Sequence, residues 1–221
     1  MSAEVVWHGV LLPREEYNDS FVAAADALAD AARDGAWARV FALPDDRAGV
    51  WSLGANDWRR GGDSWFSPLH QAAWHGASID VVEGLVARAA WRALRDAEGR
   101  RPVDIAREGG ADHLLDALEP RFAGSPSEAD LAGMSAGLAG LVEEAAGQAR
   151  CTAPIRHLDA ACVAESDGTV WFPIPGMYGG FSVRMFHRRL HVESWSRVVG
   201  GSGRAYVITG DRVTLVDEGF V

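Results

Sequence analysis

The chain has 221 residues and 48% of them are apolar, so it is long enough to bury one large core or two small ones. Acidic side chains number 31 and basic ones 21, and the formal net charge is −10. A chain this acidic lacks the cationic excess that displaces counterions from phosphates, which argues against nucleic acid as a partner.

No stretch is apolar over membrane-spanning length, and the first residues lack the basic and apolar regions of a secretory leader. We therefore expect a cytoplasmic protein that does not engage a membrane. The two cysteines, Cys151 and Cys162, are too few for a cysteine metal cluster and are expected to be free thiols.

The first part of the chain is predicted to be largely helical. Residues 5–12 form an apolar run that fits either an extended strand or an arm packed on the following helices. Residues 21–33 are rich in alanine and place apolar side chains at helical spacing, and 36–43 fits a partner helix. Residues 45–66 are polar and glycine-rich but contain three tryptophans, which indicates an inserted loop.

A second helical hairpin begins at Ser67. Ser67 can cap the first turn, Pro68 suits the first helical position, and Gly76 tolerates a left-handed end. A further apolar helix follows over residues 79–88.

The same pattern returns 34 residues later. Residues 101–110 repeat the proline, the apolar pair, the alanine and the closing glycine, and 113–118 forms the second helix. A weaker copy, at an offset of 41, aligns 28–35 with 69–76.

This period and the Ser-Pro-Leu-His opening at 67–70 resemble the ankyrin repeat family, although Arg101 and Asp104 depart from the motif in the third copy. The resemblance implies an ankyrin-like domain over 1–122, with units at 20–44, 67–88 and 101–119. In that family, the inner helices and the connecting fingers bind other proteins on a concave surface.

The resemblance, together with the aromatic and arginine content of binding hot spots, selects ten partner-binding candidates. They are Trp58, Arg59, Arg60, Asp63, Trp65, Trp74, Arg95, Asp96, Arg107 and Glu108. Trp74 is the strongest single contact candidate. The alternative is that the loop tryptophans fold back to cover one end of the helices. His70 matches the motif histidine, which ties turns together by hydrogen bonds.

Residues 123–150 are predicted to be a linker and a packing helix. Glycine, serine and proline dominate 123–127, and Ser127 with Asp130 resembles a capping box. Apolar side chains then recur at helical spacing, while Gly133, Gly137 and Gly140 permit close approach to another element.

Residues 151–221 are predicted to be a small antiparallel β domain. Five runs of β-branched and aromatic residues with period two are separated by short turns, as in a meander. The predicted strands are 169–174, 181–187, 190–197, 204–209 and 213–217. Residues 171–181 also resemble a C-terminal module of bacterial ankyrin-repeat proteins of unassigned activity. The predicted fold class is therefore α+β.

Arginines gather in the β domain against the acidic background. Arg184, His191 and Arg197 could share one face of the sheet and hold a phosphate or carboxylate. The alternative is an ordinary solvated outer face. No catalytic or metal-binding motif is recognisable, and no cofactor or metal is predicted.

The predicted function is a protein–protein interaction module, an adaptor or regulator without catalytic activity of its own. The alternative is that the β domain binds a small anion or is an enzyme, and that the repeats target it.

Overall fold

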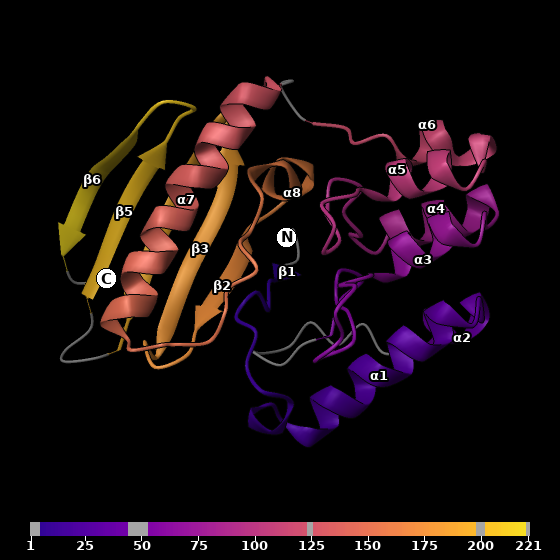
Figure 1. Cartoon of the computed structure of the whole chain (residues 1–221). Helices are drawn as coiled ribbons and strands as arrows, with labels where there is room; N and C mark the ends of the chain where they lie inside the picture. The colour runs from indigo at the N-terminus through magenta and orange to yellow at the C-terminus, as the bar shows by residue number, and fades with distance from the viewer. Residues whose placement is uncertain (1–4, 44–52, 123–125, 198–201, 220–221) are drawn as a thin grey trace. The chain divides into compact units, whose positions relative to one another are not determined.

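The computed structural model describes residues 5–43, 53–122, 126–197 and 202–219, which form two compact units (Figure 1). The helical unit comprises residues 12–121, and the sheet unit comprises residues 1–11 and 122–221. The α+β class is confirmed. The first eleven residues belong to the sheet unit, whereas the sequence placed them in the helical domain.

Three predicted features lie partly outside the described residues. They are the start of the inserted loop with Trp51, residues 123–125 of the linker, and residues 200–201 between the third and fourth predicted strands.

The helical unit contains three successive helix pairs, preceded by the short helix η1 (Arg14–Glu16). The pairs are α1 (Asp19–Arg33) with α2 (Trp37–Ala42), α3 (Pro68–Trp74) with α4 (Ile79–Val86), and α5 (Pro102–Glu108) with η2 (Asp112–Leu114) and α6 (Leu115–Leu118). The middle helix α3 packs against both α1 and α5, and α4 packs against α6. All six predicted helical segments are present, with ends within a few residues of those expected.

Two of the pairs open in the same way. Proline occupies the first helical position of α3 and of α5. The Ser67 amide donates to His70 Nδ1 at 3.2 Å, and the Arg101 amide donates to Asp104 Oδ2 at 2.9 Å. Asp104 therefore performs the capping task of the buried His70, so the departure from the motif preserves the turn.

The first helix of every pair also ends in the same way. Gly35, Gly76 and Gly110 adopt left-handed φ values of 67°, 56° and 69°. The amide that follows each glycine then donates to a carbonyl five residues earlier. These bonds join Ala36 to Ala31, Ala77 to Ala72 and Ala111 to Ala106. A left-handed glycine thus satisfies the orphan carbonyls at each helix end.

One histidine links the second helix pair to the first, and another links the third pair to the second. His75 Nε2 lies 2.8 Å from the Arg33 carbonyl at the end of α1. His113 Nε2 lies 3.0 Å from the Ala77 carbonyl beyond α3. These bonds satisfy carbonyls at helix ends and fix the spacing of the pairs.

The sheet unit contains a six-stranded sheet in the order β1-β2-β3-β4-β5-β6. The strands are β1 (Val5–Val6), β2 (Val170–Ile174), β3 (Gly179–Phe186), β4 (Arg189–Ser196), β5 (Ser202–Ile208) and β6 (Val213–Gly219). The last five pair antiparallel, which confirms the predicted meander. The additional strand β1 runs parallel to β2, so residues 5–6 are a strand.

The β3–β4 turn lies one residue earlier than expected. His187 and Arg188 both have positive φ, as in the two-residue hairpin turns that match strand twist. Arg189 consequently belongs to β4.

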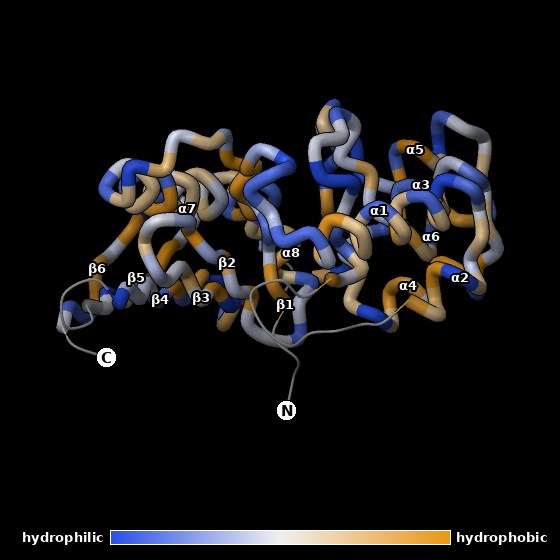
Figure 2. The backbone as a smooth tube through the Cα atoms, turned by 90° about the horizontal axis from the view of Figure 1, so that it is seen from below, coloured by the Kyte–Doolittle hydropathy of each residue, from blue (hydrophilic) through white to orange (hydrophobic). Residues whose placement is uncertain are grey.

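Helices cover one face of the sheet. The helix α7 (Glu128–Gln148) begins with the predicted capping box, in which the Asp130 amide donates to Ser127 Oγ at 3.1 Å. The short helix α8 (Ala160–Glu165) packs against α7 and β3 and was not predicted. Figure 2 shows α7 on one side of the row of strands. In the described part of this unit, no helix lies on the other side.

Two glycines bring α7 close to the sheet. A Cβ atom on Gly133 would lie 1.8 Å from the Gly210 carbonyl oxygen. A Cβ atom on Gly137 would lie 2.8 Å from side-chain atoms of Ile208 and Val213. Only glycine allows this approach, whereas Gly140 on the same helix has no neighbour within 4 Å of its Cβ position.

We predict opposite effects for two alanine substitutions in α7. Gly133→Ala should destabilise the sheet unit by about 1–3 kcal/mol, because overpacking against a backbone carbonyl outweighs the gain in helix propensity. Gly140→Ala should stabilise it by about 1 kcal/mol through propensity alone. Hydrogen exchange of the β3–β5 amides measures both; protection that rises in Gly133→Ala would contradict the close packing.

Candidate functional site

The structure divides the ten predicted partner-binding residues into three groups. Asp63, Trp74, Arg95, Arg107 and Glu108 are exposed. Arg59 and Trp65 are partly buried, and Trp58, Arg60 and Asp96 are buried. Only the first two groups are available to a partner at the surface.

Trp74 is the most prominent member of the exposed group. It is the last residue of α3, the helix between α1 and α5, and its side chain is 66% exposed. Arg33 and Glu108 occupy the corresponding positions at the ends of α1 and α5. Arg33 pairs with Asp30, and Glu108 pairs with Arg100, so the charges at both equivalent positions are already paired.

The prediction that Trp58 and Arg60 bind a partner is wrong, because both side chains are buried in the core. The Arg60 guanidinium lies 4.2 Å from the Trp58 ring centre and 5.0 Å from that of Phe21, and it forms an ion pair with Asp57. Burial lowers the pKa of Arg60 to about 10, although nearby Tyr17 acts in the opposite direction. These tryptophan and arginine side chains hold the inserted loop against η1 and α1, as the alternative for the loop tryptophans anticipated.

The prediction that Asp96 binds a partner is also wrong, because its side chain is buried. Its Oδ1 accepts the amides of Glu98 and Arg100 at 2.9 and 2.8 Å, and its Oδ2 accepts from Arg100 Nε at 2.9 Å. The carboxylate therefore shapes the loop between α4 and α5, and a buried acceptor with this many bonds is not free to contact a partner.

Arg59 is engaged by acidic side chains of α1. Its guanidinium pairs with Asp26 and Asp30, and Asp26 also pairs with Arg14. The hydrogen bond from Arg14 is the main reason that the pKa of Asp26 is lowered. Arg59 thus links the loop to α1, and only part of its side-chain surface is available to a partner.

Removing the negative charge opposite Arg60 should damage the helical unit. We expect Asp57→Asn to cost about 3 kcal/mol, because it leaves a buried guanidinium without its counter-charge. The matched change Asp63→Asn, at an exposed site in the same loop, should alter stability by less than about 0.5 kcal/mol. Hydrogen exchange in α1 and α3 tests this difference, and equal protection in both variants would refute it.

The predicted anion-binding residues do not form one compact site. Arg184 on β3 is directly opposite His191 on β4, on the face without helices. Arg197 follows the end of β4, six positions from His191, which corresponds to about 20 Å along a strand. It lies instead over the Trp195 ring, 5.1 Å from its centre. Arg184, His191 and Arg197 therefore cannot hold one small anion together.

His191 is also unsuited to bind an anion by charge. Burial lowers its pKa below the ordinary value, and the nearby guanidinium groups of Arg184 and Arg189 lower it further. Glu193 opposes this shift and His187 adds to it. The imidazole is consequently neutral at pH 7.

Removing the Arg184 guanidinium should raise the pKa of His191. We predict an upward shift in Arg184→Gln and no change in the distant control Arg212→Gln, measured by NMR titration of the imidazole. Because the pKa is lower in the folded state, protonation favours unfolding. Stability from this group should therefore fall as the pH drops below about 6.5 towards the folded pKa. A lower pKa in Arg184→Gln would contradict this account.

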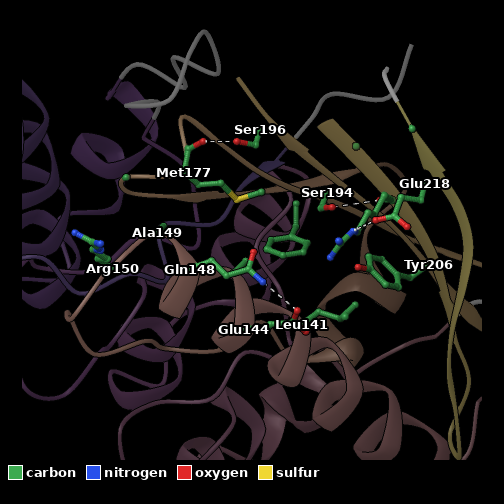
Figure 3. A pocket seen from close by; sticks show the side chains of 16 residues that line it. Leu141, Glu144, Gln148, Ala149, Arg150, Met177, Ser194, Ser196, Tyr206 and Glu218 are labelled. Carbon is green, nitrogen blue, oxygen red and sulfur yellow. Dashed lines mark hydrogen bonds and ion pairs between the residues drawn. The ribbon is translucent and has the colours of Figure 1, made fainter. Parts of the chain in front are cut away.

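A pocket lies on the opposite face of the sheet, between the C-terminal half of α7 and the strands (Figure 3). Its volume is about 620 Å³. Leu141, Glu144, Ala145 and Gln148 line its helix side. Phe181, Ser194, Ser196, Arg204, Tyr206 and Glu218 line its sheet side.

The polar groups of this pocket are paired across neighbouring elements. Arg204 Nε on β5 donates to Glu218 Oε1 on β6 at 2.8 Å, and the hydrogen bond with Glu218 is the main cause of the raised pKa of Arg204. Ser196 Oγ donates to the Met177 carbonyl at 2.9 Å, and Gln148 Nε2 donates to Glu144 Oε1 at 3.1 Å. The pocket therefore combines an apolar floor with fixed donors and acceptors.

Sequence reasoning did not select this pocket, although β4 carries a signal for it. Leu190, Val192, Ser194 and Ser196 alternate onto the helix-covered face, and the last two are polar where burial would favour apolar residues. Polar side chains at inward strand positions indicate a cavity or a ligand rather than a dry core.

Comparison with known proteins adds no assignment. No protein-family model matches the chain, and no curated protein sequence is significantly similar to it. Within the described ranges, no cluster of three or more His, Cys, Asp and Glu side chains could hold a metal ion. Nor does any helix there have the length and apolar character to cross a bilayer.

Proposed function

We propose that the helical unit is an ankyrin-like repeat module that binds another protein, as an adaptor or regulator. Three features support it: successive helix pairs, shared proline-capped openings in two of them, and left-handed glycine ends in all three. Such units stack to present one continuous surface built from equivalent positions.

Exposure of Trp74 is the observation on which the proposal depends. A tryptophan side chain has about 200 Å² of largely apolar surface, so burying the exposed two-thirds against a partner contributes about 3 kcal/mol. The residue ends a short rigid helix held between two others, so little conformational entropy is lost on binding.

The surroundings of Trp74 indicate the chemistry of the partner. Arg107 is exposed and pairs with Asp104, and Glu108 pairs with Arg100. A partner with an apolar pocket that receives the indole, and with polar groups around the rim of that pocket, would match this arrangement. The indole is the hydrophobic centre, and the charged side chains are its border.

The proposal predicts that Trp74→Ala weakens partner binding at least about 30-fold, equivalent to about 2 kcal/mol. The matched control is Ile79→Ala, which truncates a 44% exposed apolar side chain at the start of α4 in the same helix pair. Proteins captured from native extract by the full-length chain and both variants are quantified by mass spectrometry. Affinities are then measured for the protein that the wild type enriches.

Circular dichroism verifies that both variants are folded, which is expected because both side chains are exposed. Loss of the captured protein with Trp74→Ala and its retention with Ile79→Ala supports the proposal. Equal recovery by wild type and Trp74→Ala would refute the placement of the site.

A further inference from the structure

The pocket of the sheet unit lies between the C-terminal half of α7 and the strands. Gly133 and Gly137 bring the N-terminal half of the helix against β5 and the β5–β6 turn. Further along the helix, Leu141 and Ala145 line a space of about 620 Å³. This volume falls within the 300–1,000 Å³ typical of small-molecule sites.

The floor of the pocket is apolar. Phe181 on β3 is 2% exposed and lines the cavity. Leu141 and Met177 line it as well (Figure 3). A ligand with an apolar body would release water from these surfaces, which is the main source of affinity in such sites.

The polar groups around the floor can satisfy both donors and acceptors. Arg204 uses Nε for Glu218 and also hydrogen-bonds Tyr206, and its remaining N–H groups can donate to a carboxylate or carbonyl. Ser196 uses its hydroxyl hydrogen for the Met177 carbonyl and is therefore not counted among the acceptors. The amide oxygen of Gln148 can accept, because Nε2 serves Glu144.

Charges in the lining balance. Glu144 and Glu218 oppose Arg150 and Arg204, so a simple anion would meet two carboxylates as well as two guanidiniums. A ligand that carries one charge of each sign matches this arrangement better than one that carries either alone.

From these contacts we infer that the pocket binds a short peptide with free termini and apolar side chains. The apolar side chains lie on Phe181 and Leu141, and the terminal carboxylate pairs with Arg204. The amino terminus and amide N–H groups face Glu144 and the acceptor oxygen of Gln148. This site is separate from the surface around Trp74 and does not depend on it.

The test titrates the ¹⁵N-labelled full chain with a pool of tripeptides composed of Ala, Val, Leu and Phe, with free termini, to about 5 mM, where even weak millimolar binding is visible. Amide shifts are expected within 141–150, 176–181, 194–196 and 203–206. No shifts, or shifts confined to other regions, would overturn the inference.

Two variants with matched controls test the contacts. Ala145→Trp fills the cavity and should abolish the shifts, whereas Gly140→Ala, at an open position of the same helix, should preserve them. Arg204→Gln should weaken the binding of the free-acid tripeptides at least tenfold and leave the binding of the corresponding C-terminal amides unaffected. Arg212→Gln should change the affinity for neither. Binding that survives Ala145→Trp, or equal effects of Arg204→Gln on acids and amides, would refute the site or the carboxylate contact.

Discussion

The close approach of α7 to the strands is the constraint on which the sheet unit depends. A six-stranded sheet must bury one face, and the helix can lie against it only where Gly133 and Gly137 remove the side chains that would hold it away. Further along the helix, Val142 and Ala146 are also buried, while Leu141, Glu144, Ala145 and Gln148 line the pocket over Phe181 and Ser196. The same element therefore closes the core and forms one wall of the pocket.

The helical unit relies on buried polar groups in its loops. Arg60 lies between aromatic rings with Asp57 as its counter-ion, and Asp96 organises the loop before α5 through backbone amides. A small helical unit whose loops carry many polar atoms must satisfy them internally, because each orphaned group costs about as much as a lost core contact. Residues that resemble binding hot spots in composition are here required for folding.

The two faces of the sheet have different chemistry because α7 and α8 cover one of them. On the helix-covered face, polar residues replace apolar ones only at the strand ends, where the pocket lies. On the other face, Arg184 and Arg197 lie towards opposite ends of the strands and do not form a shared site, and the guanidinium groups of Arg184 and Arg189 lower the pKa of His191. A binding role for the sheet unit therefore belongs to the helix-covered face, and the exposed indole of Trp74 belongs to a separate surface on the helical unit.

The sequence by itself determined the elements: helical spacing, proline and glycine punctuation and period-two runs located the six helical segments of the first half, α7 and the five-stranded meander. These signals are local, because capping, turn chemistry and periodicity depend on residues a few positions apart. Tertiary structure alone decided that residues 5–6 join the sheet, that α8 packs beside α7, and that Trp58, Arg60 and Asp96 are buried. It also brought Arg204, Ser196 and Gln148 around one cavity. Such outcomes depend on contacts between distant segments, and burial of an arginine or tryptophan is set by what packs against it rather than by its own side chain.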